Sequence, residues 1–573
     1  MNMKMKSIFI LIALMAFNIQ SCDKFLEEDL VSDVSGSSYY TTAAGLEDAV
    51  DATYSTLKYI HSNERAHSLT IFGTDTYTNG ADGGHKSFNW YDGGLNSASS
   101  QIREMWDALY RGINQANAVI NRSQNIVGLD PAVLTLRLAE VRFLRAYYYF
   151  TLVRQFGDVH LSLEETEGAE VEANKTPQAT IYDQAIIADL EFAIANLPAS
   201  QSDYGRATKP AAQHLLGLAL LTRGYQSFAN ADDFSRAEAL FGNVINDYNF
   251  ALEPSMASLW DQSNDKNNEI IFAVQYGTDE ILNGGEGNRS HLYFLMEYDI
   301  QPGMIRDTEN GRPFKRFKPT QYLLDLWGAN RDNDSRYELT YKHAWISNNP
   351  NSIPNWTPEA VAAGAKNADG SPAVAGQPRW TVGDTAIFIP GPGKEAQWTP
   401  TKRLQTRYNI YLTTEYNERV FAHIGKFMDP RRPAIQWERG SRDWFIMRLG
   451  DTYLLRAEAR LAQGNTTDAA DDINVVRVRA AWPGKEAAMM ITPGDVTMDF
   501  LLEERARELD AEQERWYTLT RTGTLVDRVS AYNVQATGVA PFHVHRPIPQ
   551  NQIDRTLGGY EQNCGYPGGP SCN

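Results

Sequence analysis

Apolar positions recur every three or four residues over several long stretches of the chain, which is the period of an amphipathic helix. In residues 131–156 the recurring residues are Leu136, Ala139, Phe143, Ala146, Tyr147 and Phe150. Pro131 suits the first turn of such a helix and Gly157 suits its end. The same period predicts helices over residues 178–197, 209–228, 234–247, 443–463, 466–480 and 497–522. The pattern therefore predicts an all-α fold.

Some of these helices are expected to pair as tetratricopeptide-type units. In such a unit small residues let two helices approach and large residues fill the groove between them, and residues 443–480 follow this pattern with Tyr453, Ala457, Gly464, Ala469, Ile473 and Val476. A looser pair is marked by Gly217, Ala237, Phe241 and Val244. The helices over 131–156 and 178–197 form a third candidate pair. Helical repeats usually act as scaffolds.

The pattern changes in residues 261–440, where apolar runs are short and Gly, Pro and Asn are frequent. Tryptophans are spread through this stretch: Trp345, Trp356, Trp380 and Trp398. Loops that carry large aromatic residues on a rigid frame suit a binding surface. We therefore expect an N-terminal helical part (22–260), a loop-rich region (261–440) and a C-terminal helical part (441–573) that completes the same domain.

The first 21 residues have the pattern of a secretory signal peptide. Two lysines precede an apolar run over residues 7–19, which is shorter than the roughly 20 residues of a permanent membrane span. Ser21-Cys22 resembles the end of a lipobox, although Gln20 departs from the small residue usual there. We expect Cys22 to carry a lipid. The alternative is an ordinary signal peptide that is cut nearby, with an incidental cysteine.

Charge and cysteine usage narrow the classes of function. The net charge of −18 repels nucleic acid on average. One local basic cluster could still receive an acidic sugar: Arg312, Lys315, Arg316 and Lys318. The absence of cysteine between Cys22 and Cys564 excludes thiol catalysis and a Cys-based zinc site in the body of the chain. Cys564 and Cys572 lie in a Gly/Pro-rich tail, where they either form a disulfide or remain free thiols.

The acidic helix predicted over residues 501–515 raises the question of glycoside hydrolysis. Its glutamates, among them Glu503 and Glu504, alternate with arginines, which favours the ionised carboxylates of a salt-bridged helix face. A glycosidase needs one carboxylic acid with a raised pKa, so we expect no catalysis. Metal content stays open: His543 and His545 have no third ligand nearby, and the acidic residues 332–334 lack the other features of an EF-hand calcium loop.

Residues 70–96 form a polar loop, punctuated by glycines, between two helical patterns. Sugar rings present an apolar C–H face and a rim of hydroxyls, so their recognition needs an aromatic platform beside hydrogen-bonding groups. Trp90 and Asn89 are the leading candidates for ligand contact. Further candidates are Asp75, Tyr91, Asn96 and, outside the loop, Trp345. The alternative for Trp90 is packing in the core, and for Trp345 packing beneath the loop-rich region.

Several segments resemble, in order, the SusD/RagB family of Bacteroidetes nutrient-binding lipoproteins. The quoted segments are the acidic stretch after Cys22, 139–161, 204–224, 318–326 with 334–336, 443–462 (DWFIMRLGDTYLLRAEARLA), 502–516 and 546–554. The chain departs from the family near its end, where residues 563–566 read NCGY instead of the frequent NPGY. The resemblance covers essentially the whole chain after the signal peptide.

This resemblance implies a SusD-like helical fold, with tetratricopeptide units on one side and irregular ligand-binding loops opposite. It also implies a lipid-anchored, surface-exposed protein of the outer membrane that captures oligo- or polysaccharide, without catalysis and without a cofactor, and delivers it to a SusC-like TonB-dependent transporter. Ligand contacts in the family often come from the loop that corresponds to residues 70–96. The alternatives are a peptide-capturing RagB-like protein and an α/α-toroid glycan hydrolase or lyase.

Overall fold

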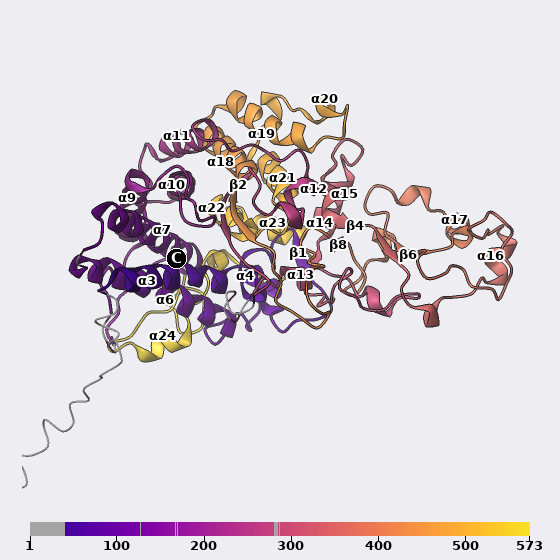
Figure 1. Ribbon diagram of the computed structural model, residues 1–573, viewed down its shortest axis with the longest axis horizontal. Coiled ribbons are helices and arrows are strands. Elements are labelled where there is room, and N and C mark those ends of the chain that lie inside the picture. Colours follow the sequence, from indigo (N-terminus) through magenta and orange to yellow (C-terminus); the bar gives the residue numbers. More distant parts are fainter. Residues whose placement is uncertain are drawn as a thin grey trace, which may run out of the picture.

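The computed structural model describes residues 41–126, 128–166, 168, 170–279, 283, 285 and 287–572. The predicted signal peptide, Cys22 and the acidic stretch after it lie outside these residues. The described chain is mostly helical, as predicted, and its long helices form the body of the molecule (Figure 1). They are α3 (Ala43–Ile60), α6 (Ser100–Arg122), α7 (Pro131–Phe156), α9 (Ala188–Asn196), α10 (Lys209–Gly224), α11 (Asp233–Asn246), α18 (Leu449–Ala462) and α19 (Thr466–Ala480).

These helices pack as a continuous array in which each contacts the next, in the order α3, α6, α7, α9, α10, α11, α18 and α19. The three predicted pairs are therefore present, and α3 with α6 adds a pair that the sequence pattern did not indicate. Gly217 of α10 shows why a small residue is needed, because a Cβ atom there would lie 2.8 Å from the ring of Phe241 on α11. The array is thus a tetratricopeptide-type scaffold.

The helix predicted over 178–197 contains a π-helical stretch, Tyr182–Ile187, and the one predicted over 209–228 ends at Gly224. Two other predicted helices differ more from the structure. The helix expected from residue 443 begins only at Leu449, because β9 (Trp444–Arg448) pairs with β2 (Ile270–Val274) and is largely buried. The helix expected over 497–522 is broken into α21 (Met498–Glu508) and α22 (Arg515–Arg521). Between them Ala511 and Gln513 adopt positive φ values of 62° and 67°. This turn directs Asp510 and Glu512 to buried partners, which a continuous helix would not do.

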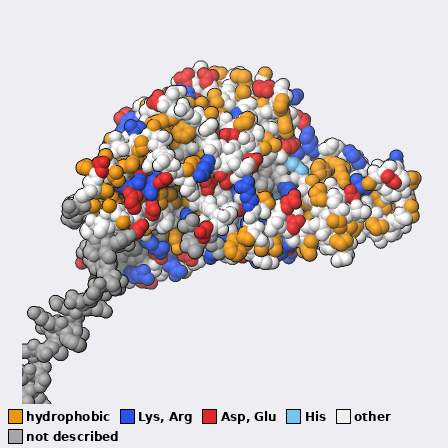
Figure 2. Space-filling view, in the orientation of Figure 1, with side chains coloured by type: hydrophobic (Ala, Val, Ile, Leu, Met, Phe, Trp, Pro, Cys, Tyr) orange, Lys and Arg blue, Asp and Glu red, His pale blue; other side chains and the backbone are white. Residues whose placement is uncertain are grey.

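Short strands and short helices replace the array in the middle of the chain, and one further strand, β1 (Tyr77–Asn79), lies in the loop of residues 70–96. The strands are β1, β3 (Phe317–Pro319), β4 (Tyr341–Lys342), β5 (Ala344–Ile346), β6 (Thr385–Phe388), β7 (Asn409–Ile410) and β8 (His423–Ile424). They pair as β1–β3, β4–β8 and a three-stranded sheet β5–β6–β7. Residues 343–422, here called the lobe, contain this last sheet with α16 (Pro358–Ala362) and α17 (Pro400–Gln405). The lobe projects from the helical body (Figure 1), and Figure 2 shows the same projection in the space-filling view.

The lobe has a small core of its own. Trp345, Trp380 and Ile387 are buried there together with Met296 and Phe421. The main core, in contrast, runs through the helical array and beneath β1 and β3. In the part of the chain that the structure describes, none of the helices is long and apolar enough to cross a membrane.

Candidate functional site

The loop predicted to bind a ligand presents one large aromatic side chain to solvent. Its short helix α5 (Ser87–Trp90) buries Phe88, and Tyr91 directly after it is buried as well, while the Trp90 side chain is 39% exposed. Tyr91 adopts a left-handed backbone conformation with φ of 55°, which is costly for a residue with a Cβ. This strain is held in place by the burial of Tyr91, so Trp90 is kept at the surface on a fixed backbone.

A distant segment of the chain clamps this loop. The Asn89 amide donates to Thr78 Oγ1 and to Gln535 Oε1, and its carbonyl accepts from Asn533. The backbone N–H of Gly538 also donates to the carbonyl of Trp90 at 3.0 Å. Asn89 is fully buried. The prediction that Asn89 contacts a ligand is therefore in conflict with the structure, because its polar atoms already bind the clamp.

Asp75 is also buried, and it carries an ion pair with two arginines. Arg515 donates to both of its carboxylate oxygens at 2.7 and 2.5 Å, and Arg528 donates to one at 2.8 Å. Burial by itself would raise the pKa of Asp75, but the two guanidinium groups outweigh it and lower the pKa. The expected ligand contact of Asp75 is thus corrected to a structural role.

The other residues predicted to contact the ligand are likewise either buried or hydrogen-bonded within the protein. Tyr91 donates its hydroxyl to the carbonyl of Gly73 and packs against His543, so it is an anchor of the loop. Trp345 is fully buried in the lobe, with its ring against His423, which corrects the expectation of ligand contact there. Asn96 is partly exposed, but its side chain bonds locally to Gly93 and Ala98. Among the predicted residues, Trp90 is the exposed aromatic platform.

The segment that clamps the loop, residues 533–538, and the helix end before it contribute surface groups that the sequence pattern did not indicate. Tyr532 is 39% exposed and its ring stacks on Tyr322 with 4.1 Å between the centroids, and Val534 is 89% exposed. Both residues flank Asn533, which binds the Trp90 loop. No local signal marked them, since Tyr532 ends an ordinary helix, α23 (Leu525–Tyr532), and Val534 lies just after it. We refer to Trp90, Tyr532 and Val534 as the aromatic surface.

The basic cluster proposed for acidic sugars is largely neutralised in the structure. Lys315 pairs with Glu297 at 2.7 Å, Arg316 with Glu64 at 2.9 Å and Arg312 with Glu438 at 2.9 Å. These carboxylates come from other segments of the chain, so the sequence alone could not show the pairing. The cluster is therefore a set of ion pairs that fastens β3 and its flanks to neighbouring elements.

The acidic helix holds a buried ion network instead of a catalytic pair. Glu504 and Glu508 are fully buried and surrounded by arginines: Arg336, Arg448, Arg477, Arg479 and Arg507. Burial would raise the pKa of Glu508, but the charges of Arg479, Arg448 and Arg336 outweigh it and hold the pKa at about 2. An acid catalyst of glycoside hydrolysis needs the opposite shift. Glu504 and Glu508 therefore lack the raised pKa of an acid catalyst, whereas burial raises the pKa of Asp510 and of Glu514 in the turn after the helix.

A cavity lies between α3 and the end of β2. Its volume is about 660 Å³, and its walls include Tyr204, Tyr276, Lys58, Lys266 and Asp443. Burial raises the pKa of Asp443 to about 7, although the backbone N–H of Tyr276 donates to its Oδ1 at 2.9 Å. Asp265 raises this pKa further, while Lys266 and Lys58 lower it. The sequence pattern does not distinguish this carboxyl group from the other acidic residues of the chain.

We expect Asp443 to make the stability of the protein depend on pH. The pKa of this carboxyl group is about 7 in the folded protein and about 4 in the unfolded chain. Between pH 4 and pH 7 the folded protein therefore holds a proton that the unfolded chain has lost, so the free energy of unfolding falls as the pH rises through this range. Asp443→Asn should therefore stabilise the protein at pH 8, by on the order of 1–3 kcal/mol, and hardly at pH 4. Urea unfolding at both pH values measures this.

The exposed Asp203 on the rim of the same cavity provides the control. Asp203→Asn is expected to change the unfolding midpoint little at either pH. Equal effects of Asp443→Asn at pH 4 and pH 8 would show that the carboxyl group is ionised throughout.

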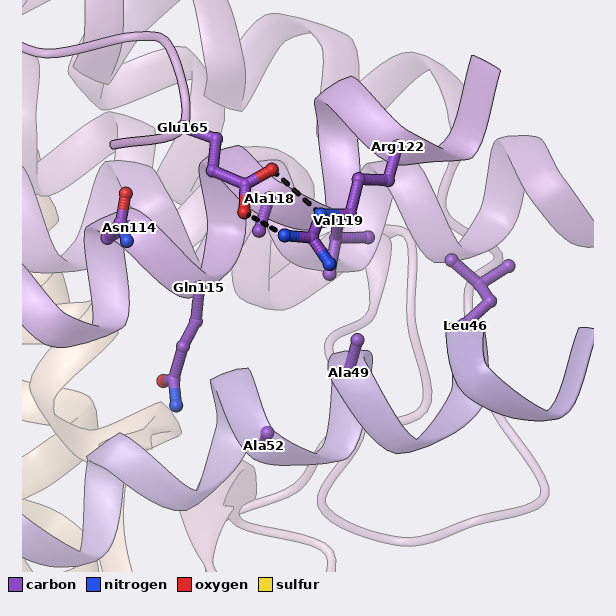
Figure 3. A pocket seen from close by; sticks show the side chains of 9 residues that line it. All are labelled: Leu46, Ala49, Ala52, Asn114, Gln115, Ala118, Val119, Arg122 and Glu165. Atoms are coloured by element: carbon purple, nitrogen blue, oxygen red, sulfur yellow. Dashed lines mark hydrogen bonds and ion pairs between the residues drawn. The ribbon is translucent and has the colours of Figure 1, made fainter. Parts of the chain in front are cut away.

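A smaller cavity of about 200 Å³ lies in the array itself. Figure 3 shows Ala49 and Ala52 of α3 facing it, with the ion pair of Arg122 and Glu165 on the opposite wall. Its small, mostly aliphatic lining offers no aromatic platform to a sugar ring. It results from the short side chains that let α3 and α6 approach.

Two predictions about covalent and metal chemistry can be compared with the structure. Cys564 and Cys572 form a disulfide, with 5.1 Å between their Cα atoms. In the ranges that the structure describes, no group of three or more His, Cys, Asp or Glu side chains is arranged to hold a metal ion. Asp334 of the acidic triplet pairs instead with Arg336.

The fold and its exposed aromatic group define a class of protein: a helical-repeat scaffold whose inserted loops form a surface. Two family models match the chain. Residues 268–566 match the model described as the SusD family, and residues 24–225 match one described as "Starch-binding associating with outer membrane". The first match covers more than half of the chain, so this protein belongs to the SusD family.

Known proteins resemble this chain over most of its length. SusD-like protein P2 of Formosa agariphila is 27% identical over 563 residues, covering 94% of this chain and 96% of its own. Starch-binding protein SusD of Bacteroides thetaiotaomicron is 25% identical over 498 residues, covering 82% and 80%. A solved laminarin-binding SusD-like protein is 23% identical, covers 92% of this chain and 100% of its own, and has a TM-score of 0.63. That structural likeness shows the fold.

Proposed function

We propose that this protein is a non-catalytic glycan-binding lipoprotein of the cell surface. Anchored in the outer membrane through a lipid on Cys22, it captures oligo- or polysaccharide and passes it to a SusC-like TonB-dependent transporter. Membership in the SusD family, the starch-binding description of one matching model and the laminarin-binding relative support a glycan as ligand. The ionised glutamates of the buried network support a role without catalysis.

The observation that carries this proposal is the position of Trp90. Its indole is exposed, yet the backbone beneath it is held by the buried Phe88 and Tyr91 and by the clamp from Gly538. A fixed aromatic face stacks on the C–H face of a sugar ring without losing further conformational freedom. Each stacked sugar contributes on the order of 1 kcal/mol, by analogy with aromatic pairs. Tight capture therefore needs several subsites or enclosure by the transporter.

Trp90→Ala is expected to weaken binding of a neutral glycan about fivefold, which corresponds to the loss of one stacking contact. The thermal midpoint should hardly change, because the indole is exposed and its anchors stay in place. Isothermal titration with laminarin and starch oligosaccharides measures the affinity, and a thermal melt measures the stability. Leu557→Ala removes a side chain that is 67% exposed elsewhere and serves as the control.

Unchanged affinity of Trp90→Ala, or a large loss of stability, would place the site elsewhere. A blank screen of glycans with binding of oligopeptides would favour the RagB-like alternative. Shortening of any polysaccharide by the purified protein would favour the hydrolase or lyase. Delivery to a transporter has its own test, since affinity purification from solubilised outer membrane should recover a large β-barrel protein. If the lipid-anchored protein is recovered without such a β-barrel protein, the proposed partner is contradicted.

A further inference from the structure

The lobe has a cavity that is separate from the aromatic surface. Its volume is about 550 Å³, and it is lined from α16, α17 and β7. This size is within the roughly 300–1,000 Å³ of small-ligand sites. In Figure 1, α16 and α17 lie in the part of the lobe that extends away from the helical body. A ligand in this cavity would therefore contact the lobe and not the helical array.

Arg379 places a positive charge in the wall of this cavity. Its guanidinium group lies 5.6 Å from the ring centroid of Trp356 and 5.3 Å from that of Trp380. It donates to Asn409 Oδ1 and to the carbonyl oxygens of Thr406 and Tyr408. An arginine has more N–H donors than these three bonds use. The side chain is thus held in one orientation, and because its Nε atom is buried without a partner, one N–H of Nη1 remains for a ligand.

The charge of Arg379 has no counter-ion among the residues that the structure describes. Its partners are neutral groups, and no described carboxylate lies within ion-pair distance. Nearby arginines differ, because Arg403 binds Glu415 and Arg407 pairs with Asp384. The fully buried Arg546 likewise donates to a backbone carbonyl, but Arg379 differs from it in lining a cavity. A half-buried cation of this kind is stabilised when an anion approaches it.

The other walls are suited to a sugar ring. Tyr408 and Tyr411 line the cavity, and Leu404, 44% exposed, lies at its edge. Tyr408 belongs to an aromatic group with Phe388 and Trp398, whose ring centroids lie 5.8 and 6.4 Å from its own. Aromatic rings and a fixed guanidinium group together match a ligand that has an apolar C–H face and a negative charge. The lining residues include no carboxylate that would repel such a ligand.

We propose that this cavity is a second glycan site, specific for sugars that carry an anionic group, with Arg379 as the residue that recognises the charge. A carboxylate on a uronic acid and a sulfate ester share this chemistry. The inference rests on the proposed function, since it takes the ligand to be a glycan, but it assigns a different location and a different selectivity. The lobe would then hold acidic chains while the aromatic surface holds neutral ones.

The test compares charged and neutral forms of one ligand on the full-length protein. Isothermal titration uses an oligogalacturonate against its methyl ester, and a sulfated oligosaccharide against its desulfated form, to distinguish the two sources of charge. Binding of at least one charged form, weakened by added salt, is expected. Equal affinity for the charged and neutral forms of both ligands would overturn the proposal.

Variants of Leu404 test the location without disturbing the packing around Arg379. Leu404→Glu should weaken binding of the charged ligand about three- to tenfold and Leu404→Lys should strengthen it, because each adds a charge at the edge of the cavity. Both substitutions are at an exposed position, so both proteins should keep the same thermal midpoint. Arg379→Met should abolish the preference for the charged form. Identical affinities of the two Leu404 variants would place any acidic-sugar site elsewhere.

Trp90→Ala separates this inference from the proposed function. If it weakens neutral glycans but leaves the charged ligand unaffected, both sites stand. If it weakens both ligands equally, the protein has one glycan site and the lobe site is rejected. If Leu404 variants change binding of the acidic ligand while Trp90→Ala changes nothing, the lobe site stands and the role of the aromatic surface is rejected.

Discussion

Replacing Arg448 with methionine is expected to lower the free energy of unfolding by about 3–5 kcal/mol, because it leaves a buried network of carboxylates short of one positive charge. Arg448 is 2% exposed in its side chain and donates to Glu269 at 2.9 Å, to Glu508 at 2.7 Å and to Glu512 at 2.7 Å. Methionine fills similar space but donates no hydrogen bond. Urea unfolding at pH 7 measures the difference.

The loss should shrink in acid. The pKa of Glu508 is held at about 2 by its arginines, so its contribution to stability is complete above the unfolded pKa of about 4 and disappears as the pH falls towards 2. The variant should therefore differ less from the unmodified protein at pH 3 than at pH 7. Glu269 and Glu512 pair with the same arginine.

Arg236→Met is the matched control. Arg236 pairs with Glu191 at 3.0 Å, but both side chains are well exposed, and such surface pairs contribute about 0–1 kcal/mol. A loss as small as this for Arg448→Met would contradict the interpretation of the acidic helix as a buried network. It would also reopen the question of a catalytic carboxylate there.

The helices could be predicted from the sequence because their signal is local. The apolar period over residues 131–156 and 466–480 has the same bounds as α7 and α19. The period fails where tertiary contacts dominate, as in residues 509–514, where Asp510 accepts hydrogen bonds from the hydroxyls of Tyr77 and Tyr341. Those partners lie far away in the sequence. The interruption of the helix therefore has no local signature.

The candidate site was less predictable, and for the same physical reason. A polar, glycine-rich loop indicates a surface, and Trp90 is indeed exposed. Whether Asn89 faces a ligand or the interior depends on Gln535, which lies 446 positions further along the chain. Arg379 was not predicted at all, because an arginine is distinctive only once the structure shows which acids lie beside it. Pairing of charges is a property of the fold and is not visible in the pattern of one segment.

Asp75 provides the sharpest test of this distinction between ligand contact and internal support. Asp75→Asn is expected to destabilise the protein by about 3–5 kcal/mol, because it leaves the buried guanidinium group of Arg515 without a carboxylate and Arg528 with only the exposed Asp499. Asp499→Asn is the matched control, since Asp499 pairs with the same Arg528 at 2.8 Å but is 80% exposed, and it should cost less than about 1 kcal/mol. Urea unfolding measures both variants, and glycan titration at a temperature where both remain folded measures binding. If the Asp75→Asn protein is stable but binds glycan more weakly, Asp75 contacts the ligand. If it loses stability and its folded fraction keeps the glycan affinity, Asp75 supports the loop beneath Trp90 from the interior.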